Sequence, residues 1–92
     1  MENGEKRYEI AVHGRVQGVG FRYAARNQAR LLGLKGWVEN RPDGSVLIQV
    51  QGKPEACNVY ITWCQTGPAY SWVERIELTE KPTASLSHFR IL

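Results

Sequence analysis

The stretch RYEIAVHGRVQGVGFRYAARNQARLLGL, residues 7–34, changes its hydrophobic period once, and this change predicts the first half of the fold. Apolar side chains alternate with polar ones through Ile10 and Val12, which is typical of a strand with one buried face. From Phe21 onward they recur every three or four residues, which predicts a helix that closes where Gly33 can adopt a positive φ. A glycine-rich loop separates the two patterns.

The rest of the sequence predicts a second helix and further strands around a tight turn. The predicted elements are a strand over 7–14, a helix over 21–34, strands over 35–41 and 45–51, a helix over 53–67, a strand over 71–81 and a short strand over 88–92. Pro, Asp and Gly at 42–44 favour a hairpin turn. The order β-α-β-β-α-β is that of a ferredoxin-like α+β sandwich, with two helices on one face of an antiparallel, four- to five-stranded sheet.

Length and composition are typical of a small globular domain. The 92 residues, 42% of them hydrophobic, predict a single domain over 1–92, with residues 1–6 frayed. The apolar runs are all shorter than the roughly 20 residues of a membrane helix. The polar N-terminal segment lacks the apolar core of a signal peptide, so we expect a cytoplasmic protein that does not contact membranes. We expect a monomer by default.

The charge of the chain and the spacing of its cysteines limit which ligands and metals it could bind. The net charge of +3 comes with scattered Lys and Arg, which favours an anionic partner without choosing between nucleic acid and a small phosphate. Cys57 and Cys64 would lie about 10 Å apart along a helix, too far for a disulfide. His13 and His88 are distant in sequence, and the cysteines and histidines lack zinc-ligand spacing, so we expect no metal site.

The predicted topology brings two polar features together. In this fold the third strand runs antiparallel between the first and the second, so the first two strands point the same way. The glycine loop follows the first strand, and Asn40 ends the second, so we expect them to meet at one edge of the sheet. Alternation places Asn40 on the same face as Val38, towards the helices.

The loop itself has the features of an anion cradle. Gly14, Gly18 and Gly20 permit positive φ, so that successive N–H groups can converge on an anion. Arg22 lies in the first helical turn, where free N–H groups and the helix dipole also favour negative charge. The loop lacks the third glycine of the dinucleotide fingerprint and the GK[ST] of a Walker A loop. From these residues alone, an anion cradle and a plain glycine-rich turn remain equally good interpretations.

Two segments resemble the signatures of the acylphosphatase family. VHGRVQGVGFR (12–22) is similar to the first signature, and GWVENRPDGSV (36–46), followed by Gly52, is similar to the second. The resemblance extends over residues 7–92. It implies hydrolysis of the carboxyl–phosphate anhydride bond of acyl phosphates, which yields a carboxylate and inorganic phosphate.

Matched residue by residue, the resemblance implies roles for two side chains and a loop. Arg22 corresponds to the arginine that binds the substrate phosphate, and Asn40 to the asparagine that positions the attacking water. The phosphate-binding backbone corresponds to Arg15, Val16, Gln17, Gly18, Val19 and Gly20. Glu39 departs from the family, which usually has a basic or neutral residue there. Because alternation turns Glu39 away from Asn40, we expect little effect on affinity.

The resulting hypothesis is in-line attack by water, which needs no metal or cofactor. Arg22 and the loop N–H groups would stabilise the phosphoryl oxygens while Asn40 holds the water, and Gln17 is expected to hydrogen-bond the loop. One rival is a carbamoyl-phosphate- or anion-binding module, because acylphosphatase-like domains occur in larger hydrogenase-maturation proteins. The other is an RNA-binding domain. Strand 45–51 lacks the aromatic side chains of an RRM, so we expect no nucleic-acid partner.

Overall fold

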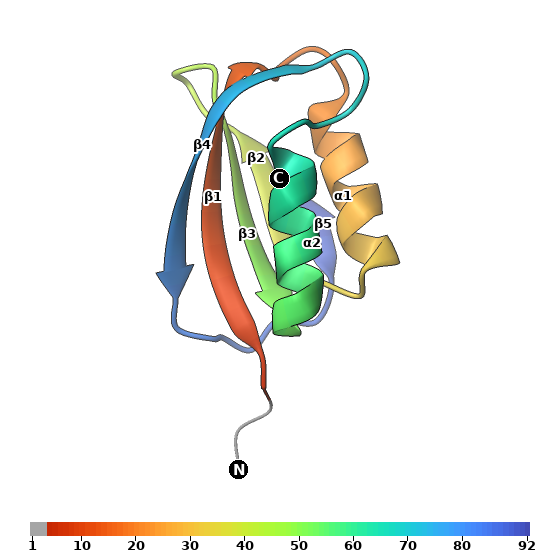
Figure 1. Ribbon diagram of the computed structural model, residues 1–92, viewed down its shortest axis with the longest axis vertical. Coiled ribbons are helices and arrows are strands. Elements are labelled where there is room, and N and C mark those ends of the chain that lie inside the picture. Colours follow the sequence, from red (N-terminus) through yellow and green to blue (C-terminus); the bar gives the residue numbers. More distant parts are fainter. Residues whose placement is uncertain (1–3) are drawn as a thin grey trace.

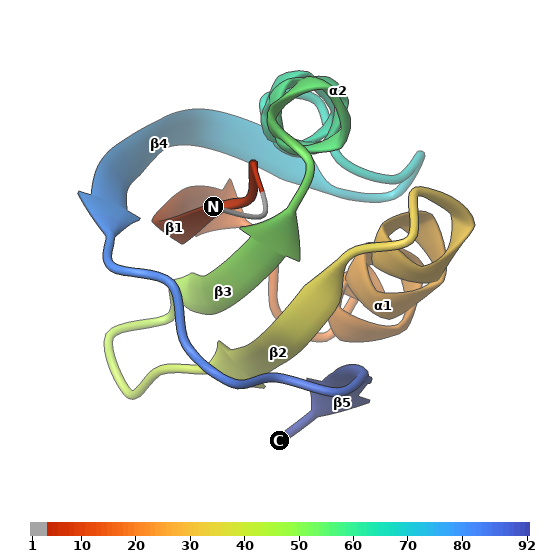
Figure 2. The ribbon, with the colours of Figure 1, turned by 90° about the horizontal axis from the view of Figure 1, so that it is seen from below.

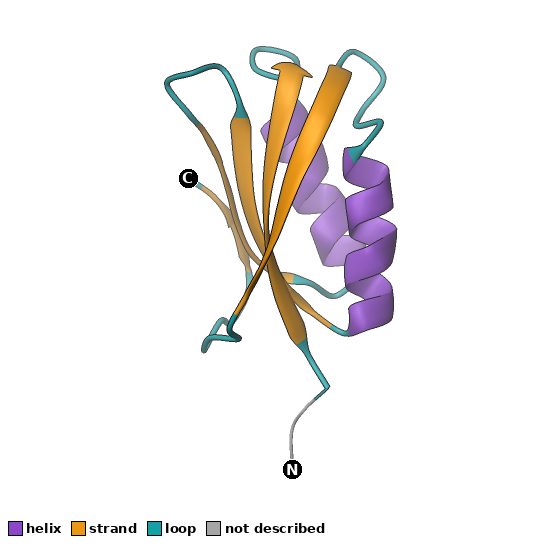
Figure 3. Cartoon of the chain, turned by 60° about the vertical axis from the view of Figure 1, so that its left-hand side comes forward, coloured by secondary structure: helices purple, strands orange, loops and turns teal. Residues whose placement is uncertain are grey.

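Two helices cover one face of a five-stranded sheet in the computed structural model, which describes residues 4–92 (Figures 1 and 3). The elements are, in chain order, β1 (Lys6–Arg15), α1 (Phe21–Leu31), β2 (Lys35–Asn40), β3 (Val46–Gly52), α2 (Pro54–Cys64), β4 (Trp72–Lys81) and β5 (Phe89–Ile91). The predicted ferredoxin-like order and the short fifth strand are confirmed. Within residues 4–92, the helices are all too short or too polar to cross a membrane.

The strands lie in the order β4-β1-β3-β2-β5, which Figure 2 shows end-on. As predicted, β3 is central and pairs antiparallel with both β1 and β2. β5 corrects the expectation of a purely antiparallel sheet, because it pairs parallel with β2. The chain leaves β4 at the end of the sheet where β2 begins and enters β5 there, beside Gly36. It therefore runs alongside β2 in the same direction.

The core lies between the covered face of the sheet and the two helices. Its strand residues include Ile10, Val12, Val38, Ile48 and Val50, and its helix residues are Phe21, Ala25, Ala29, Cys57, Tyr60 and Cys64. The Tyr60 hydroxyl donates to the main-chain oxygen of Ala25 at 3.0 Å and so joins α2 to α1. Cys57 and Cys64 are both buried on α2, with free thiols.

Hydrogen bonds at the C-terminal end of α1 set the length of the helix. Gly33 has φ 70°, its N–H donates to the Arg30 oxygen, and the N–H of Leu34 donates to the Ala29 oxygen at 2.8 Å. These two bonds form a Schellman motif, which satisfies carbonyls that the helix leaves unpaired. Gly33 therefore closes α1 as predicted, although the helical turns end at Leu31, before the end of the predicted 21–34 segment.

The ends of β1 differ from the predicted segment. Lys6 already pairs with Gly52, so the strand begins inside the segment expected to fray, whose residues 1–3 lie outside the described part of the chain. Arg15 still pairs with Trp72, so the strand runs one residue past the predicted end. On the open face of the sheet, the Arg7 guanidinium lies 5.6 Å from the ring centre of Trp37 and covers it.

Candidate active site

The loop between β1 and α1 is held open by its glycines. Gly18 and Gly20 have φ values of 75° and 78°, a region that other residues adopt only with strain. A Cβ at either position would meet no atom within 4 Å, so the positive φ accounts for the glycines and crowding does not. The first bond of α1 runs from the Ala24 N–H to the Gly20 oxygen. The three N–H groups before Ala24 have no partner inside the helix and remain available to a ligand.

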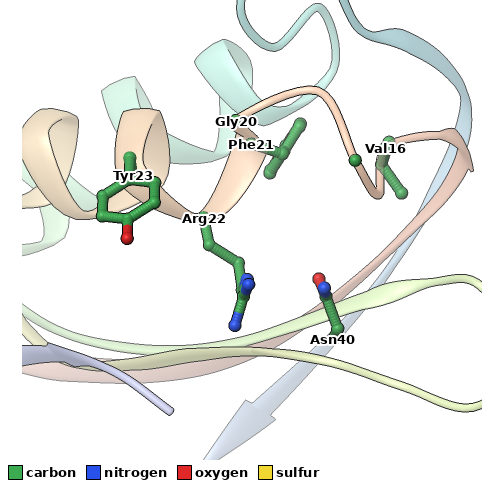
Figure 4. A pocket seen from close by; sticks show the side chains of 7 residues that line it. Val16, Gly20, Phe21, Arg22, Tyr23 and Asn40 are labelled. Atoms are coloured by element: carbon green, nitrogen blue, oxygen red, sulfur yellow. The ribbon is translucent and has the colours of Figure 1, made fainter.

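Arg22 and Asn40 point into the same space from opposite sides (Figure 4). Arg22 descends from the first turn of α1, and Asn40 rises from the end of β2. The pocket between them has a volume of about 100 Å³ and is lined by Val16, Gly18, Gly20, Phe21, Arg22, Tyr23 and Asn40. Pockets that enclose drug-sized ligands measure roughly 300–1,000 Å³. This one has room for a small group, while the rest of a ligand stays outside.

Leu92 orients the guanidinium of Arg22. Arg22 Nη1 donates to the main-chain oxygen of Leu92 at 3.1 Å, and the N–H of Leu92 donates to the Val38 oxygen at 2.8 Å. One of the five N–H donors of the guanidinium is thus used by the protein, and the others can face an anion. The sequence contained no signal for this contact, because Leu92 makes it through its main chain.

The two amide side chains near the pocket have different surroundings. Gln17 Nε2 donates to the main-chain oxygens of Arg41 at 2.8 Å and Ser45 at 2.9 Å. It therefore ties the loop to the turn that follows β2, whereas the sequence predicted a hydrogen bond within the loop. Within residues 4–92, the exposed amide of Asn40 has no hydrogen-bond partner. Gln17 thus braces the site, and the Asn40 amide remains free to bind water.

The turn that Gln17 contacts has its own brace. The N–H and the hydroxyl of Ser45 both donate to Asp43 Oδ1, at 2.9 and 2.6 Å. The hydroxyl contact, followed by the N–H contact, lowers the pKa of the Asp43 carboxyl below its ordinary value. The Asp43 carboxyl therefore remains ionised at neutral pH, as an acceptor for both Ser45 donors. This fixes the turn next to Asn40.

Some of the predicted site residues do not line the pocket. Arg15 is exposed at the end of β1, Val19 packs partly against the core, and the Gln17 amide turns to Arg41 and Ser45. The loop residues that do line the pocket are Val16, Gly18 and Gly20. Glu39 faces the other side of the sheet, as alternation predicted, and its carboxylate lies 3.7 Å from Arg41 Nη1.

The charge around the pocket favours an anion. Arg22 lines it, and the first turn of α1 contains no acidic residue. The lining includes no carboxylate, histidine, serine or cysteine side chain. Residues 4–92 contain no cluster of three or more His, Cys, Asp or Glu side chains placed to hold a metal ion. The geometry therefore suits charge neutralisation and positioning.

Tyr23 is a lining residue that the sequence reasoning missed. It follows Arg22 directly, and the residue is 59% exposed although its side chain borders the pocket. An aromatic side chain that remains exposed next to a charged site residue is the signal that could have identified it. The helical pattern indicated only that Tyr23 does not belong to the buried stripe of α1.

Fold and pocket together define a class of protein. It is a ferredoxin-like α+β domain whose glycine loop, helix N-terminus and second strand meet around a small, cationic pocket. A family model described as Acylphosphatase matches residues 8–91. The chain belongs to the acylphosphatase family, whose activity is the hydrolysis of acyl phosphates.

Relatives and solved structures agree with this assignment. An acylphosphatase of Thiobacillus denitrificans is 48% identical over 75 residues, which cover 82% of this chain and 84% of the relative. The solved acylphosphatase of Coxiella burnetii has a TM-score of 0.94 at 31% identity, with 97% of this chain and 94% of that chain covered. The acylphosphatase of Bacillus subtilis has a TM-score of 0.91 at 39% identity, with 95% and 98% covered. The resemblance drawn from the two motifs is confirmed.

Proposed function

We propose that this chain hydrolyses acyl phosphates by direct in-line attack of water on phosphorus. Arg22 and the N–H groups at the start of α1 bind the phosphoryl group, and Asn40 holds the water. The observation that carries the proposal is the convergence of Arg22 and Asn40, from separate elements, on one small pocket beside a helix N-terminus.

Binding of the phosphoryl group accounts for the cationic side of the pocket. The transferring group carries its negative charge on the three oxygens that are not being exchanged. The guanidinium of Arg22 offers a planar set of donors to two of them, and the free N–H groups before Ala24 can reach the remainder. These donors are already oriented in the folded chain, by Leu92 at one end and by the open loop at the other. Preorganised donors of this kind stabilise charge without reorganising during the reaction.

Asn40 supplies the position of the nucleophile. Its amide oxygen can accept a hydrogen bond from water and its NH₂ group can donate one, so the water is oriented without being ionised beforehand. A new bond forms between the water oxygen and phosphorus, and the bond between phosphorus and the bridging oxygen breaks. The carboxylate leaves with the electron pair, and a phosphoryl oxygen of the substrate accepts the proton of the water. The carboxylate is weakly basic, so its departure needs no general acid.

The remaining features of the function follow from this chemistry. The substrate is an acyl phosphate, and the inorganic phosphate produced competes with it for the same pocket. The reaction needs no cofactor or metal. We propose a monomeric protein in the cytoplasm, without a nucleic-acid or membrane partner. Analytical ultracentrifugation at assay concentrations tests the monomer, and a dimer would contradict it.

The test is steady-state hydrolysis of benzoyl phosphate, corrected for the spontaneous reaction without protein. We expect turnover that survives a metal chelator and that inorganic phosphate inhibits competitively. Tight phosphate binding without turnover would instead support the anion-binding module. Loss of activity with chelator, restored by a divalent metal, would contradict the metal-free mechanism.

A further inference from the structure

The pocket is too small for the acyl part of the substrate, so residues at its rim must recognise the acyl group. A volume of about 100 Å³ accepts the phosphoryl group, so the acyl group must lie over the rim. The two aromatic residues of the lining differ sharply there. Phe21 is 1% exposed and belongs to the core, whereas Tyr23 is 59% exposed. Tyr23 is therefore a large, exposed aromatic surface in the pocket lining that a bound acyl group can reach.

The Tyr23 ring has a cationic neighbour, Arg26, before any ligand binds. It projects from α1 to the same side as Arg22, with its hydroxyl directed towards the strands (Figure 4). The guanidinium carbon of Arg26, one turn further along the helix, lies 5.3 Å from the ring centre. A cation over an aromatic face is attractive, so Arg26 restrains the ring. A restrained ring loses little conformational freedom when a ligand packs against it.

We propose that Tyr23 determines acyl specificity and that the preferred substrates carry a planar, aromatic acyl group. The proposal rests on the proposed function, because it assumes that the phosphoryl group occupies the pocket beside Arg22. Aromatic groups gain more from packing against an aromatic ring than small aliphatic groups do, both in apolar area and in the geometry of the ring pair. A methyl group at the same place covers little of the ring.

The first test compares kcat/KM for benzoyl phosphate and acetyl phosphate. In Tyr23→Ala, the ratio of the two values falls by roughly 3- to 10-fold, the range expected for one aromatic pair. Tyr23→Phe keeps the ratio, because the ring remains. Tyr70→Ala is the matched control, since Tyr70 is 84% exposed and does not line the pocket, and it leaves the ratio unchanged. An unchanged ratio in Tyr23→Ala, or an equal loss for both substrates, would overturn the proposal.

A second measurement uses the unmodified protein. Benzylphosphonate and ethylphosphonate, which are not hydrolysed, compete with acetyl phosphate in the assay. We expect benzylphosphonate to inhibit at a concentration about 3-fold or more below that of ethylphosphonate. Equal inhibition constants would overturn the role of Tyr23. The two proposals fail in different ways: absence of turnover for both acyl phosphates rejects the proposed function, whereas turnover with an unchanged ratio rejects only the role of Tyr23.

Discussion

The two helices of this fold begin in opposite ways, although both have free N–H groups and a positive dipole end. The N-cap of α1 is Gly20, in a left-handed conformation, and the first turn of α1 has no acidic residue. The N-cap of α2 is Lys53, in an extended conformation, and it is followed by Pro54 and by Glu55 in the first turn. Proline has no N–H to offer, and the Glu55 carboxylate supplies negative charge at the dipole. The start of α2 thus has one N–H fewer and carries its own negative charge, whereas that of α1 has neither feature and is left to a ligand.

This comparison shows that a helix N-terminus becomes a site through its surroundings. At α1 the loop approaches without side chains at Gly18 and Gly20, Arg22 adds charge, and Asn40 arrives from β2. At α2, Lys53 and Glu55 are exposed, and Pro54 occupies the first turn. Changes that make α1 resemble α2 should therefore remove activity, while the equivalent changes at α2 should not.

The largest effect is expected from Arg22→Ala. Removal of the guanidinium takes away both the binding charge and donors to the reacting group, so kcat/KM should fall by about 10³-fold or more. Lys53→Ala removes the cation at the start of α2 and should leave kcat/KM unchanged. Steady-state hydrolysis of acetyl phosphate checks both variants. Comparable losses in the two would show that general surface charge, and not the site at α1, drives binding.

Asn40→Ala should have the second largest effect, a loss of about 10²-fold in kcat. The substrate still binds through Arg22, so KM should change much less than kcat. Asn58→Ala, an exposed asparagine on α2, is the control and should behave like the unmodified protein. The measurement is the initial rate over a range of acyl phosphate concentrations up to saturation, which gives kcat and KM. A variant with raised KM and intact kcat would place Asn40 in substrate binding.

Gly20→Ala and Gly33→Ala test the two ends of α1 against each other. Both glycines have positive φ, and a Cβ at either would meet no atom within 4 Å. Each alanine should therefore lower the free energy of unfolding by about 1–2 kcal/mol through backbone strain. Only Gly20→Ala should also lower kcat/KM, because Gly20 lines the pocket and backbone strain there displaces the phosphate-binding loop. Urea unfolding and the activity assay separate the effects, and equal activity losses would refute the distinction.

The smallest expected effect is a loss of stability at alkaline pH, which depends on the thiols on the buried face of α2. Burial raises the pKa of the thiols of Cys57 and Cys64 above the ordinary value of 9.0, whereas the buried stripe of α1 has no titratable group. The folded state thus keeps these protons more tightly than the unfolded state. The resulting stability is fully present below about pH 9 and is lost as pH rises above it.

Urea unfolding at a series of pH values checks this loss. The free energy of unfolding should decline above pH 9 in the unmodified protein, and the decline should be shallower in Cys64→Ala. Cys64→Ala should be less stable throughout, because it leaves a cavity, but only its pH slope bears on the prediction. A slope identical to that of the unmodified protein would rule out a role for the buried thiol.

Much of this could be predicted from the sequence because it depends on periodicity and strand order. Alternation and helical spacing placed the elements, and the parallel course of β1 and β2 brought Asn40 to the glycine loop. The direction of β5 was missed because side-chain alternation indicates that a strand is present and does not show whether it pairs parallel or antiparallel. The hydrogen bond from Arg22 to Leu92 was missed because its acceptor is a main-chain oxygen, a group that every residue has. The sequence offered one signal for Tyr23, an aromatic residue outside the buried stripe and next to Arg22, but its position at the pocket also depends on its side-chain rotamer and on Arg26.

The central claim is that the pocket presents phosphorus, and not the acyl carbon, to water. Hydrolysis of acetyl phosphate in water enriched with oxygen-18 tests it directly, with mass spectrometry of both products. We predict that one labelled oxygen appears in inorganic phosphate and none in acetate, after correction for the spontaneous reaction. Label in acetate would mean that water attacks the carbonyl carbon, and it would contradict the roles given to Arg22 and Asn40.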